Sequence, residues 1–232
     1  MQANILITGA NRGIGLEFIK QYAAADWRVF ACCRKPRDAD ELNRLAEKSG
    51  GGVSVHRLDV ADPDQRAALA RELGDTPIDV LVNNAGIYGQ HEATFGNTDE
   101  RKWLETFSVN TIAPMKLSEL LVDNVARSRR KIIASVSSMM GSIEDNSSGG
   151  HYVYRSSKAA LNAVMKSMAI DLRARGIIAV ILHPGWVQTE MGGPNAQISV
   201  AQSVTGMRSV LDGLKPEDAG KFFNVGGGLI PW

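Results

Sequence analysis

The sequence predicts one α/β domain built on a doubly wound parallel sheet of about seven strands, with helices on both faces. Three observations support this fold class. Short apolar runs rich in β-branched residues alternate with longer helical patterns along the whole chain. A glycine-rich turn stands between the first such run and the first helical pattern. The 232 residues suffice for the core of one such domain and are few for two, and neither an internal repeat nor a linker divides them.

Composition and charge limit the partners that the chain can have. The 26 lysines and arginines nearly balance the 25 aspartates and glutamates, so the net charge of +1 gives no general attraction to nucleic acid or to an anionic membrane. The two cysteines are adjacent and the four histidines are scattered, so we expect no disulfide and no metal site. The N-terminus lacks the pattern of a signal peptide, and no run approaches the ~18 apolar residues that span a bilayer. We therefore expect a cytoplasmic protein.

In the first half of the chain, strand-like and helix-like patterns alternate. Residues 4–8 form a short apolar run, and the segment from Gly13 to Tyr22 then carries apolar residues at helical spacing. The following runs are again short, apolar and rich in β-branched residues, as expected for strands buried on both faces. These next strands are expected at 27–33, 53–58 and 78–83.

In the second half, the run at 131–136 predicts the fifth strand. A long helix is expected over about 153–173, where apolar residues such as Leu161 and Met165 recur at helical spacing. Residues 192–200 contain Gly, Pro and Asn with little periodicity, which indicates either a mobile loop over a site or an ordinary surface connection. The sixth and seventh strands are expected at 177–182 and 222–225.

The turn after the first strand has the composition of a dinucleotide-binding loop. It reads Thr8-Gly9-Ala10-Asn11-Arg12-Gly13-Ile14-Gly15 and leads directly into the first helix. Glycines let the backbone turn tightly and approach a pyrophosphate, while the free N–H groups and the positive end of the helix attract its charge. The turn therefore predicts a Rossmann-type site for a dinucleotide.

The spacing of this loop, together with three later motifs, resembles the short-chain dehydrogenase/reductase family. The loop matches the TGxxxGIG form of that family, and the later motifs follow in family order and at family-like intervals. They are NNAG at 83–86, YxxxK at 154–158, and PG at 184–185 with a following Thr189. The resemblance implies a single domain over 1–232, with a cofactor half at about 1–130 and a catalytic and substrate half at about 131–232.

The resemblance also implies which residues bind the cofactor. Asp59 and Val60 would contact the adenine, and Asn83, Ala85 and Gly86 would lie along the adenosine and nicotinamide riboses. Asn83 and Asn84 could equally tie neighbouring strands together, and we expect the two roles to be mixed at these positions. The residues expected to bind the cofactor are Gly9, Asn11, Arg12, Gly13, Ile14, Gly15, Arg34, Asp59, Val60, Asn83, Ala85, Gly86, Tyr154, Lys158, Pro184, Gly185, Val187 and Thr189.

The end of the second strand favours NADP(H) as that cofactor. An acidic residue there would hold the adenosine ribose and disfavour a 2′-phosphate, but the sequence has Arg34 and Lys35 at this position. With Arg12 as a second contact, guanidinium groups suit the extra phosphate because they bind it in a forked geometry. If Arg34 and Lys35 are only solvated loop charges, NAD(H) is the alternative.

Tyr154 and Lys158 form the expected reaction centre. They stand at i and i+4 of the predicted helix, so they project from one face. A neighbouring ammonium stabilises a phenolate, so Lys158 is expected to lower the pKa of Tyr154 and make it a usable acid in reduction, or a base in oxidation. Tyr152 has Ser156 at i+4, which carries no charge, so the register selects Tyr154.

The resemblance adds a serine and an asparagine to the catalytic residues. An SSxxG pattern after the fifth strand implies that Ser138 holds the carbonyl oxygen, while strand alternation turns Ser137 the other way. Asn110 matches the family asparagine that bends a helix and positions a water in the proton path. The interval from Ser138 to Tyr154 is 16 residues (154 − 138), longer than in the commonest members. The extra residues, within 142–150, are expected to reshape the substrate mouth.

The segments 140–162 and 183–193, with the terminal 230–232, are similar to the sniffer and C-factor branch of carbonyl reductases. This resemblance implies an NADPH-dependent reductase of aldehydes or ketones that acts on a small-molecule carbonyl or alcohol and associates into a homodimer or homotetramer. The C-factor relation also supports a second hypothesis, a signalling or regulatory protein that binds a dinucleotide with little turnover. The complete set of four catalytic residues favours the enzyme, because a sensor has no chemical need for all four.

Overall fold

The structure, a computed structural model, describes residues 2–232 and contains one sheet of seven parallel strands. The strands are β1 (Asn4–Thr8), β2 (Arg28–Cys33), β3 (Val53–Arg57), β4 (Val80–Asn83), β5 (Ile132–Val136), β6 (Ile178–His183) and β7 (Phe222–Asn224). Their order, β3-β2-β1-β4-β5-β6-β7, changes direction between β1 and β4, and ligands bind at the carboxyl ends of strands at such a switch point. The predicted fold class is confirmed.

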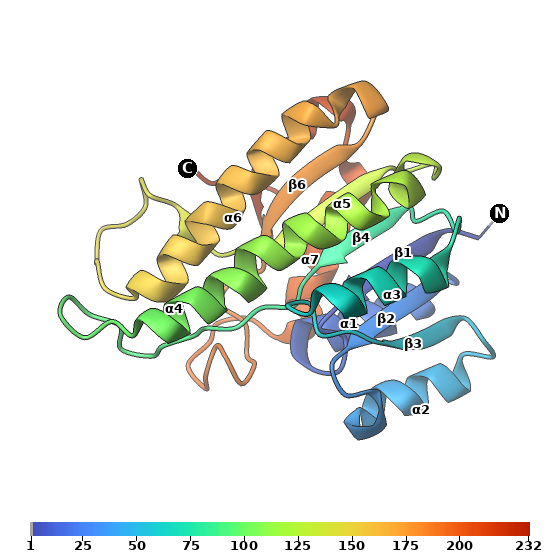
Figure 1. The fold of residues 1–232 in the computed structure, drawn as a ribbon, viewed down its shortest axis with the longest axis horizontal. Coiled ribbons are helices and arrows are strands. Elements are labelled where there is room, and N and C mark those ends of the chain that lie inside the picture. Colours follow the sequence, from blue (N-terminus) through green and yellow to red (C-terminus); the bar gives the residue numbers. More distant parts are fainter. Residues whose placement is uncertain (1) are drawn as a thin grey trace.

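Helices cover both faces of this sheet (Figure 1). The helices α1, α2 and α7 pack on one face, whereas α3, α5 and α6 pack on the other, with α4 against α6. Along β1, Ile5 and Ile7 point into the first layer and Leu6 into the second, because side chains alternate along a strand. Burial on both faces explains why the strands are continuous apolar runs in the sequence. The helices are α1 (Gly13–Ala23), α2 (Asp40–Lys48), α3 (Pro63–Leu73), α4 (Glu100–Phe107), α5 (Ala113–Ala126), α6 (Tyr152–Asp171) and α7 (Val200–Gly213).

Several strands begin later than the apolar pattern predicts. Trp27 precedes β2, and its N–H donates to the Tyr22 carbonyl at 3.1 Å in the turn after α1. Ile78 precedes β4, and its N–H donates to the carbonyl of Asn124 in α5 at 3.0 Å. These backbone groups bond to helix residues instead of a neighbouring strand, which an apolar run does not reveal.

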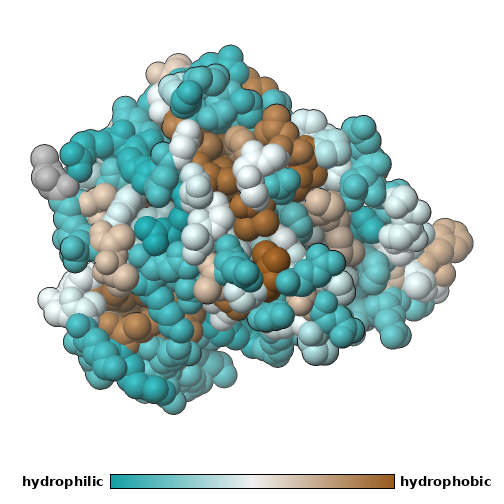
Figure 2. All heavy atoms as spheres, turned by 180° about the vertical axis from the view of Figure 1, so that it is seen from behind, coloured by the Kyte–Doolittle hydropathy of each residue, from teal (hydrophilic) through white to brown (hydrophobic). Residues whose placement is uncertain are grey.

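The outer surface is mixed in polarity. Seen from the side of the α1, α2 and α7 layer, hydrophilic side chains cover most of the face and a hydrophobic strip crosses its middle (Figure 2). None of the helices within residues 2–232 combines the length and the apolar character that a bilayer crossing requires.

Candidate active site

The glycine-rich loop lies between the carboxyl end of β1 and the start of α1. Gly9 has a φ of +68°, and a Cβ atom there would lie 3.0 Å from the Cα atom of Ala85, just after β4. A Cβ atom on Gly15 would lie 2.1 Å from the carbonyl oxygen of Gly9. Within the same loop Asn11 is exposed and Ile14 is half-buried. Only glycine fits at the two close contacts, so the loop folds tightly against the neighbouring strand end.

Polar side chains hold the ends of β1 and β4 together. The hydroxyl oxygen of Thr8 accepts hydrogen bonds from the main-chain N–H groups of Asn84 and Ala85, each at 3.0 Å. The side-chain amide of Asn84 donates to the Thr8 carbonyl at 2.9 Å. The Asn83 side chain is buried and donates to the Ser118 hydroxyl of α5 at 3.2 Å. The side chains of both asparagines therefore have the structural role, since they tie β1, β4 and α5 together.

The start of α1 presents backbone donors to the site. Arg12 is the N-cap residue, and its side chain makes no capping hydrogen bond to the helix. The first N–H groups and the helix dipole form the kind of site that binds a pyrophosphate. The exposed guanidinium of Arg12 forms an ion pair with Glu190, in the loop after β6. A Cβ atom on Gly13 would lie 3.5 Å from Thr189 in that loop, so the two loops meet beside the start of α1.

The ends of β2 and β3 carry the residues predicted for the adenosine side. Arg34 and Lys35 are exposed directly after β2. Lys35 Nζ lies 3.9 Å from Asp38 Oδ2, whereas Arg34 has no salt-bridge partner within residues 2–232. Asp59 and Val60 follow β3, which pairs with β2, and Val60 is buried. The structure thus places the predicted phosphate contact and the predicted adenine contacts at two adjacent strand ends.

The loop after β6 forms the opposite side of the site. Gly185 has a φ of +82°, and a Cβ atom there would lie 2.5 Å from Cδ1 of Ile198. Val187 is buried and forms a β-bridge with Ile198. The Thr189 hydroxyl oxygen accepts from a main-chain N–H of segment 192–200 at 3.1 Å. Segment 192–200 is therefore bonded to the loop after β6 at both Gly192 and Ile198.

Tyr154 and Lys158 lie one turn apart near the start of α6. Both side chains are buried, with exposed fractions of 8% and 5%. Lys158 Nζ lies 5.7 Å from the centroid of the Tyr154 ring and donates to the Val136 carbonyl of β5 at 2.9 Å. A Cβ atom on Gly86, in the NNAG motif, would lie 3.6 Å from the same Nζ. The predicted pair is thus brought together with the end of β5 and the loop after β4.

Burial dominates the acid–base properties of this pair. It raises the pKa of Tyr154 to about 12, although a side-chain hydrogen bond with Ser138 acts in the opposite direction. Burial also lowers the pKa of Lys158 to about 8. The structure therefore differs from the expectation that Lys158 lowers the pKa of Tyr154. The reason is that both groups lose hydration, which disfavours the phenolate and the ammonium alike.

Close packing places Ser138 beside α6. Ser138 is the N-cap of a short 3₁₀ turn, η3 (Met139–Gly141), and a Cβ atom on Gly141 would lie 2.8 Å from the main-chain carbon of Lys158. The turn can pack directly on the helix because this position is glycine. His183 holds the turn from β6, since its Nδ1 accepts from the first N–H of η3 at 3.2 Å. Burial lowers the pKa of His183 to about 4, so the ring stays neutral and can accept this bond.

Asn110 lies in a π-helical turn, η2 (Ser108–Ile112), that separates α4 from α5. Its side chain is buried, and Oδ1 accepts from the Ile87 N–H at 2.9 Å. Its Nδ2 donates to the Ile87 carbonyl at 2.8 Å and to the Ser157 hydroxyl at 3.0 Å. The π turn interrupts the regular helical hydrogen bonds, as such turns often do at functional sites. Asn110 therefore connects the loop after β4 to α6, one residue from Lys158.

Reasoning from the sequence missed Tyr88, which lies against Tyr154. The two ring centroids are 4.5 Å apart, with 14° between their planes. The Tyr88 hydroxyl lies 3.0 Å from Nδ1 of His151. In the sequence the only signal is that Tyr88 stands two residues after the NNAG motif, and this does not reveal the direction of the ring.

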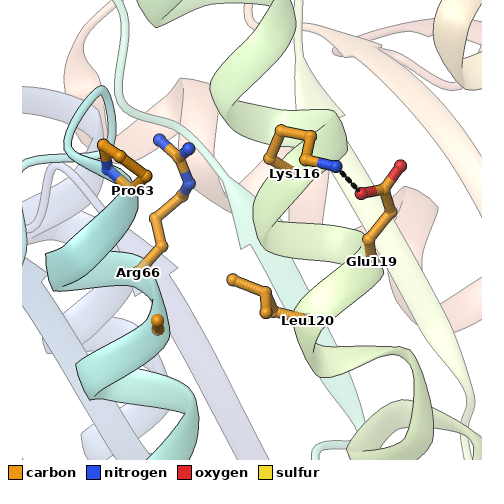
Figure 3. Close-up of a pocket in the computed structure, with 6 residues that line it drawn as sticks. Pro63, Arg66, Lys116, Glu119 and Leu120 are labelled. Atoms are coloured by element: carbon orange, nitrogen blue, oxygen red, sulfur yellow. Dashed lines mark hydrogen bonds and ion pairs between the residues drawn. The ribbon is translucent and has the colours of Figure 1, made fainter.

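A separate pocket of about 290 Å³ lies on the surface between α3 and α5 (Figure 3). Arg66 of α3 and Lys116 of α5 line it from facing helices, and Lys116 is ion-paired with Glu119. Its lining within residues 2–232 includes none of the residues predicted to bind the cofactor or to act in catalysis. The candidate site is thus at the strand ends and not in this pocket.

Comparisons with known proteins identify the family of the chain. A family model described as short chain dehydrogenase matches residues 3–198. The C-signal protein of Myxococcus xanthus is 44% identical over 165 residues, which cover 71% of this chain and 99% of that protein. The carbonyl reductase Sniffer of D. melanogaster has a TM-score of 0.93 at 33% identity. An NADPH-bound carbonyl reductase from chicken fatty liver has a TM-score of 0.91 at 35% identity, and each of these two matches covers 100% of both chains.

Proposed function

The chain belongs to the short-chain dehydrogenase family of NAD(P)-dependent oxidoreductases, and we propose that it is an NADPH-dependent reductase of aldehydes or ketones. One observation carries the proposal. Tyr154 is buried beside Lys158 and Ser138 at the carboxyl edge of the sheet, the edge at which the glycine-rich loop also lies. The similarity to an NADPH-bound carbonyl reductase supports this choice of reaction and cofactor.

The strand ends fit a nicotinamide dinucleotide. Gly9 and Gly15 fold a tight loop whose backbone can approach a pyrophosphate, at the start of a helix that presents free N–H groups. Arg34 would bind the 2′-phosphate, and Val187 and Thr189 would hold the nicotinamide amide. When bound, NADPH supplies the hydride for the carbonyl carbon.

Tyr154 supplies the proton in this proposal. Its hydroxyl donates to the carbonyl oxygen of the substrate as negative charge develops there, while the Ser138 hydroxyl donates a hydrogen bond to the same oxygen. A protonated Lys158, whose Nζ lies 5.7 Å from the centroid of the Tyr154 ring, would offset part of the cost that burial imposes on the phenolate that remains. Because the pKa of Lys158 is about 8, this stabilisation is present below that pH and is lost as the pH rises through it. In oxidation the phenolate would act as the base.

Substitutions of the two neighbouring serines separate catalysis from stability. The Ser137 hydroxyl is buried and donates to Asn162 Oδ1 at 2.7 Å, so it is bonded one turn beyond Lys158 on α6. We expect Ser137→Ala to lower the free energy of unfolding by about 1–3 kcal/mol, because a buried acceptor loses its partner. We expect Ser138→Ala to lower kcat about tenfold or more, with a loss of stability of about 1 kcal/mol at most, because the hydroxyl caps only the three-residue turn η3. Urea unfolding and initial rates measure the two effects, and the reverse pattern would contradict the assignment.

Substitution of Arg34 tests the choice of cofactor. Arg34→Ala removes a cation that no acidic side chain neutralises within residues 2–232. A charge-assisted bond to phosphate contributes roughly 1.5–3 kcal/mol, so we expect KM for NADPH to rise about tenfold or more while KM for NADH stays the same. Arg37→Ala is the matched control, because Arg37 is also exposed and stands only three residues after Arg34. Equal effects on both cofactors would refute the assignment of Arg34.

A panel of aldehydes and ketones, assayed with NADPH and with NADH, tests the proposed reaction itself. Oxidation of NADPH that depends on the carbonyl compound would support a reductase. The similarity to C-signal supports a second candidate, a signalling protein that binds the dinucleotide with little turnover. Tight binding of NADPH without reduction of any compound in the panel would favour that second candidate.

We also propose a cytoplasmic homodimer or homotetramer in which each copy uses residues 1–130 for the cofactor and 131–232 for catalysis and substrate. Apolar side chains on the helices of one layer support association, because Leu104, Leu120 and Ile170 are exposed on α4, α5 and α6. Light scattering of the purified protein measures the number of copies directly.

A further inference from the structure

Tyr88 extends from the loop after β4 over the ring of Tyr154. The ring centroids are 4.5 Å apart and the planes differ by 14°, which is a stacked arrangement. His91 stacks on the far face of Tyr88, with centroids 4.8 Å apart and planes at 11°, and is itself exposed. The proton donor is thus the inner member of a stack of three rings that reaches the surface.

The backbone on both sides of Tyr88 is fixed. The main-chain N–H and carbonyl of Ile87 both bond to the Asn110 side chain, at 2.9 and 2.8 Å. On the other side Gly89 has a φ of +77°, and a Cβ atom there would lie 2.2 Å from the Thr106 hydroxyl oxygen. Only glycine allows this approach to α4, so the loop cannot shift without breaking one of the two attachments. The direction of the Tyr88 ring is therefore set by its neighbours.

The Tyr88 hydroxyl is attached to the start of the helix that carries Tyr154. It lies 3.0 Å from Nδ1 of His151, the N-cap residue of α6. His151 has a φ of +50°, a left-handed conformation that is uncommon for a residue other than glycine. Such conformations are held in place by their surroundings and occur preferentially at functional sites. Tyr88 and Tyr154 are thus coupled twice, through their stacked rings and through His151.

We propose that Tyr88 is a positioning residue that fixes the ring of Tyr154 and keeps water from one face of it. This inference rests on the proposed role of Tyr154 as the proton donor. The other groups that face Tyr154 are Ser138 and Lys158, and Tyr88 itself faces Arg155 in addition to the two histidines. Among these groups only Tyr88 stacks on the Tyr154 ring within the described residues.

Steady-state kinetics with four variants test the proposal. We expect Tyr88→Ala and Tyr88→Leu to lower kcat about three- to tenfold, the size of one lost aromatic pair, with little change in KM. Tyr88→Phe keeps the stacked ring and should restore most of kcat. His91→Ala is the matched control, because it removes a ring from the far face of Tyr88 and leaves the contact with Tyr154. A rise in KM with unchanged kcat would overturn the proposal and make Tyr88 a wall of the substrate site.

Titration of Tyr154 gives a readout that does not depend on turnover. The four tyrosines can be replaced by fluorotyrosine, a more acidic phenol, and followed by fluorine NMR, with Tyr154→Phe to assign the resonance. Burial and the Tyr88 hydroxyl both raise the pKa of Tyr154, so Tyr88→Ala should move its midpoint to lower pH while His91→Ala should not. An unchanged midpoint would overturn the proposal even in an active enzyme. A shifted midpoint in a protein that reduces no carbonyl would refute the proposed reaction and uphold the coupling of the two tyrosines.

Discussion

Tyr154→Phe is expected to lower kcat/KM for carbonyl reduction about a thousandfold, within the range that general acid catalysis contributes. The phenylalanine ring can keep the stacking on Tyr88 and the packing against η3, because only the hydroxyl is removed. The Kd for NADPH should change little, since the glycine-rich loop, Arg34 and the loop after β6 remain intact. Initial rates and a fluorescence titration with NADPH measure the two quantities separately.

Tyr152→Phe is the matched control for this experiment. Tyr152 stands one half-turn away on α6 and is 38% exposed, compared with 8% for Tyr154. Loss of the Tyr152 hydroxyl should leave kcat/KM nearly unchanged. If Tyr154→Phe kept full activity, or if Tyr152→Phe lost it, the assignment of the proton donor would be wrong.

Gly15→Ala is expected to weaken NADPH binding by one to two orders of magnitude. The added methyl carbon would lie 2.1 Å from the Gly9 carbonyl oxygen, a main-chain atom that cannot rotate away. Gly9 is also held in place, because the Asn84 side-chain amide donates to its carbonyl oxygen at 3.3 Å and the Ala85 backbone lies close on the other side. Overpacking of this kind typically costs about 1–3 kcal/mol, and here it would distort the loop that approaches the pyrophosphate. Calorimetric titration with NADPH measures the effect.

Gly213→Ala is the control for the glycine substitution. Gly213 ends α7, and a Cβ atom there meets nothing within 4 Å among the described residues. Alanine should leave NADPH binding unchanged and raise Tm slightly, because it reduces the conformational freedom of the unfolded chain. Equal losses of affinity in both variants would show that the glycine-rich loop does not bind the cofactor.

The fold was predictable because its strands are buried on both faces. Continuous apolar runs such as 4–8 and 177–182 stand out between amphipathic helices, and the parallel order follows from their alternation. The ends of the strands were not predictable from the apolar runs, because they depend on single hydrogen bonds. The bond from Ile78 to Asn124 joins residues far apart in the chain and has no local signal.

The candidate site was predictable where a motif has a fixed spacing. The glycine-rich loop, Tyr154 and Lys158 lie at one edge of the sheet, as their motifs imply. The pKa of Tyr154 was not predictable, because it depends on burial by elements that are distant in sequence. Tyr88 was missed for the same reason, since only the folded loop shows that its ring lies on Tyr154.

The π-helical turn η2 also sets the rotational phase between α4 and α5. Each residue of an α-helix turns the chain by about 100°, so the wider turn rotates α4 relative to the course of a continuous helix. With this offset the Trp103 indole N–H donates to the Ser156 hydroxyl of α6 at 2.9 Å, while Leu117 of α5 still faces the sheet. Deletion of one residue from η2 would restore a regular helix and swing Trp103 and Thr106 away from α6. The loop that carries Tyr88 would then lose the surface against which Gly89 packs.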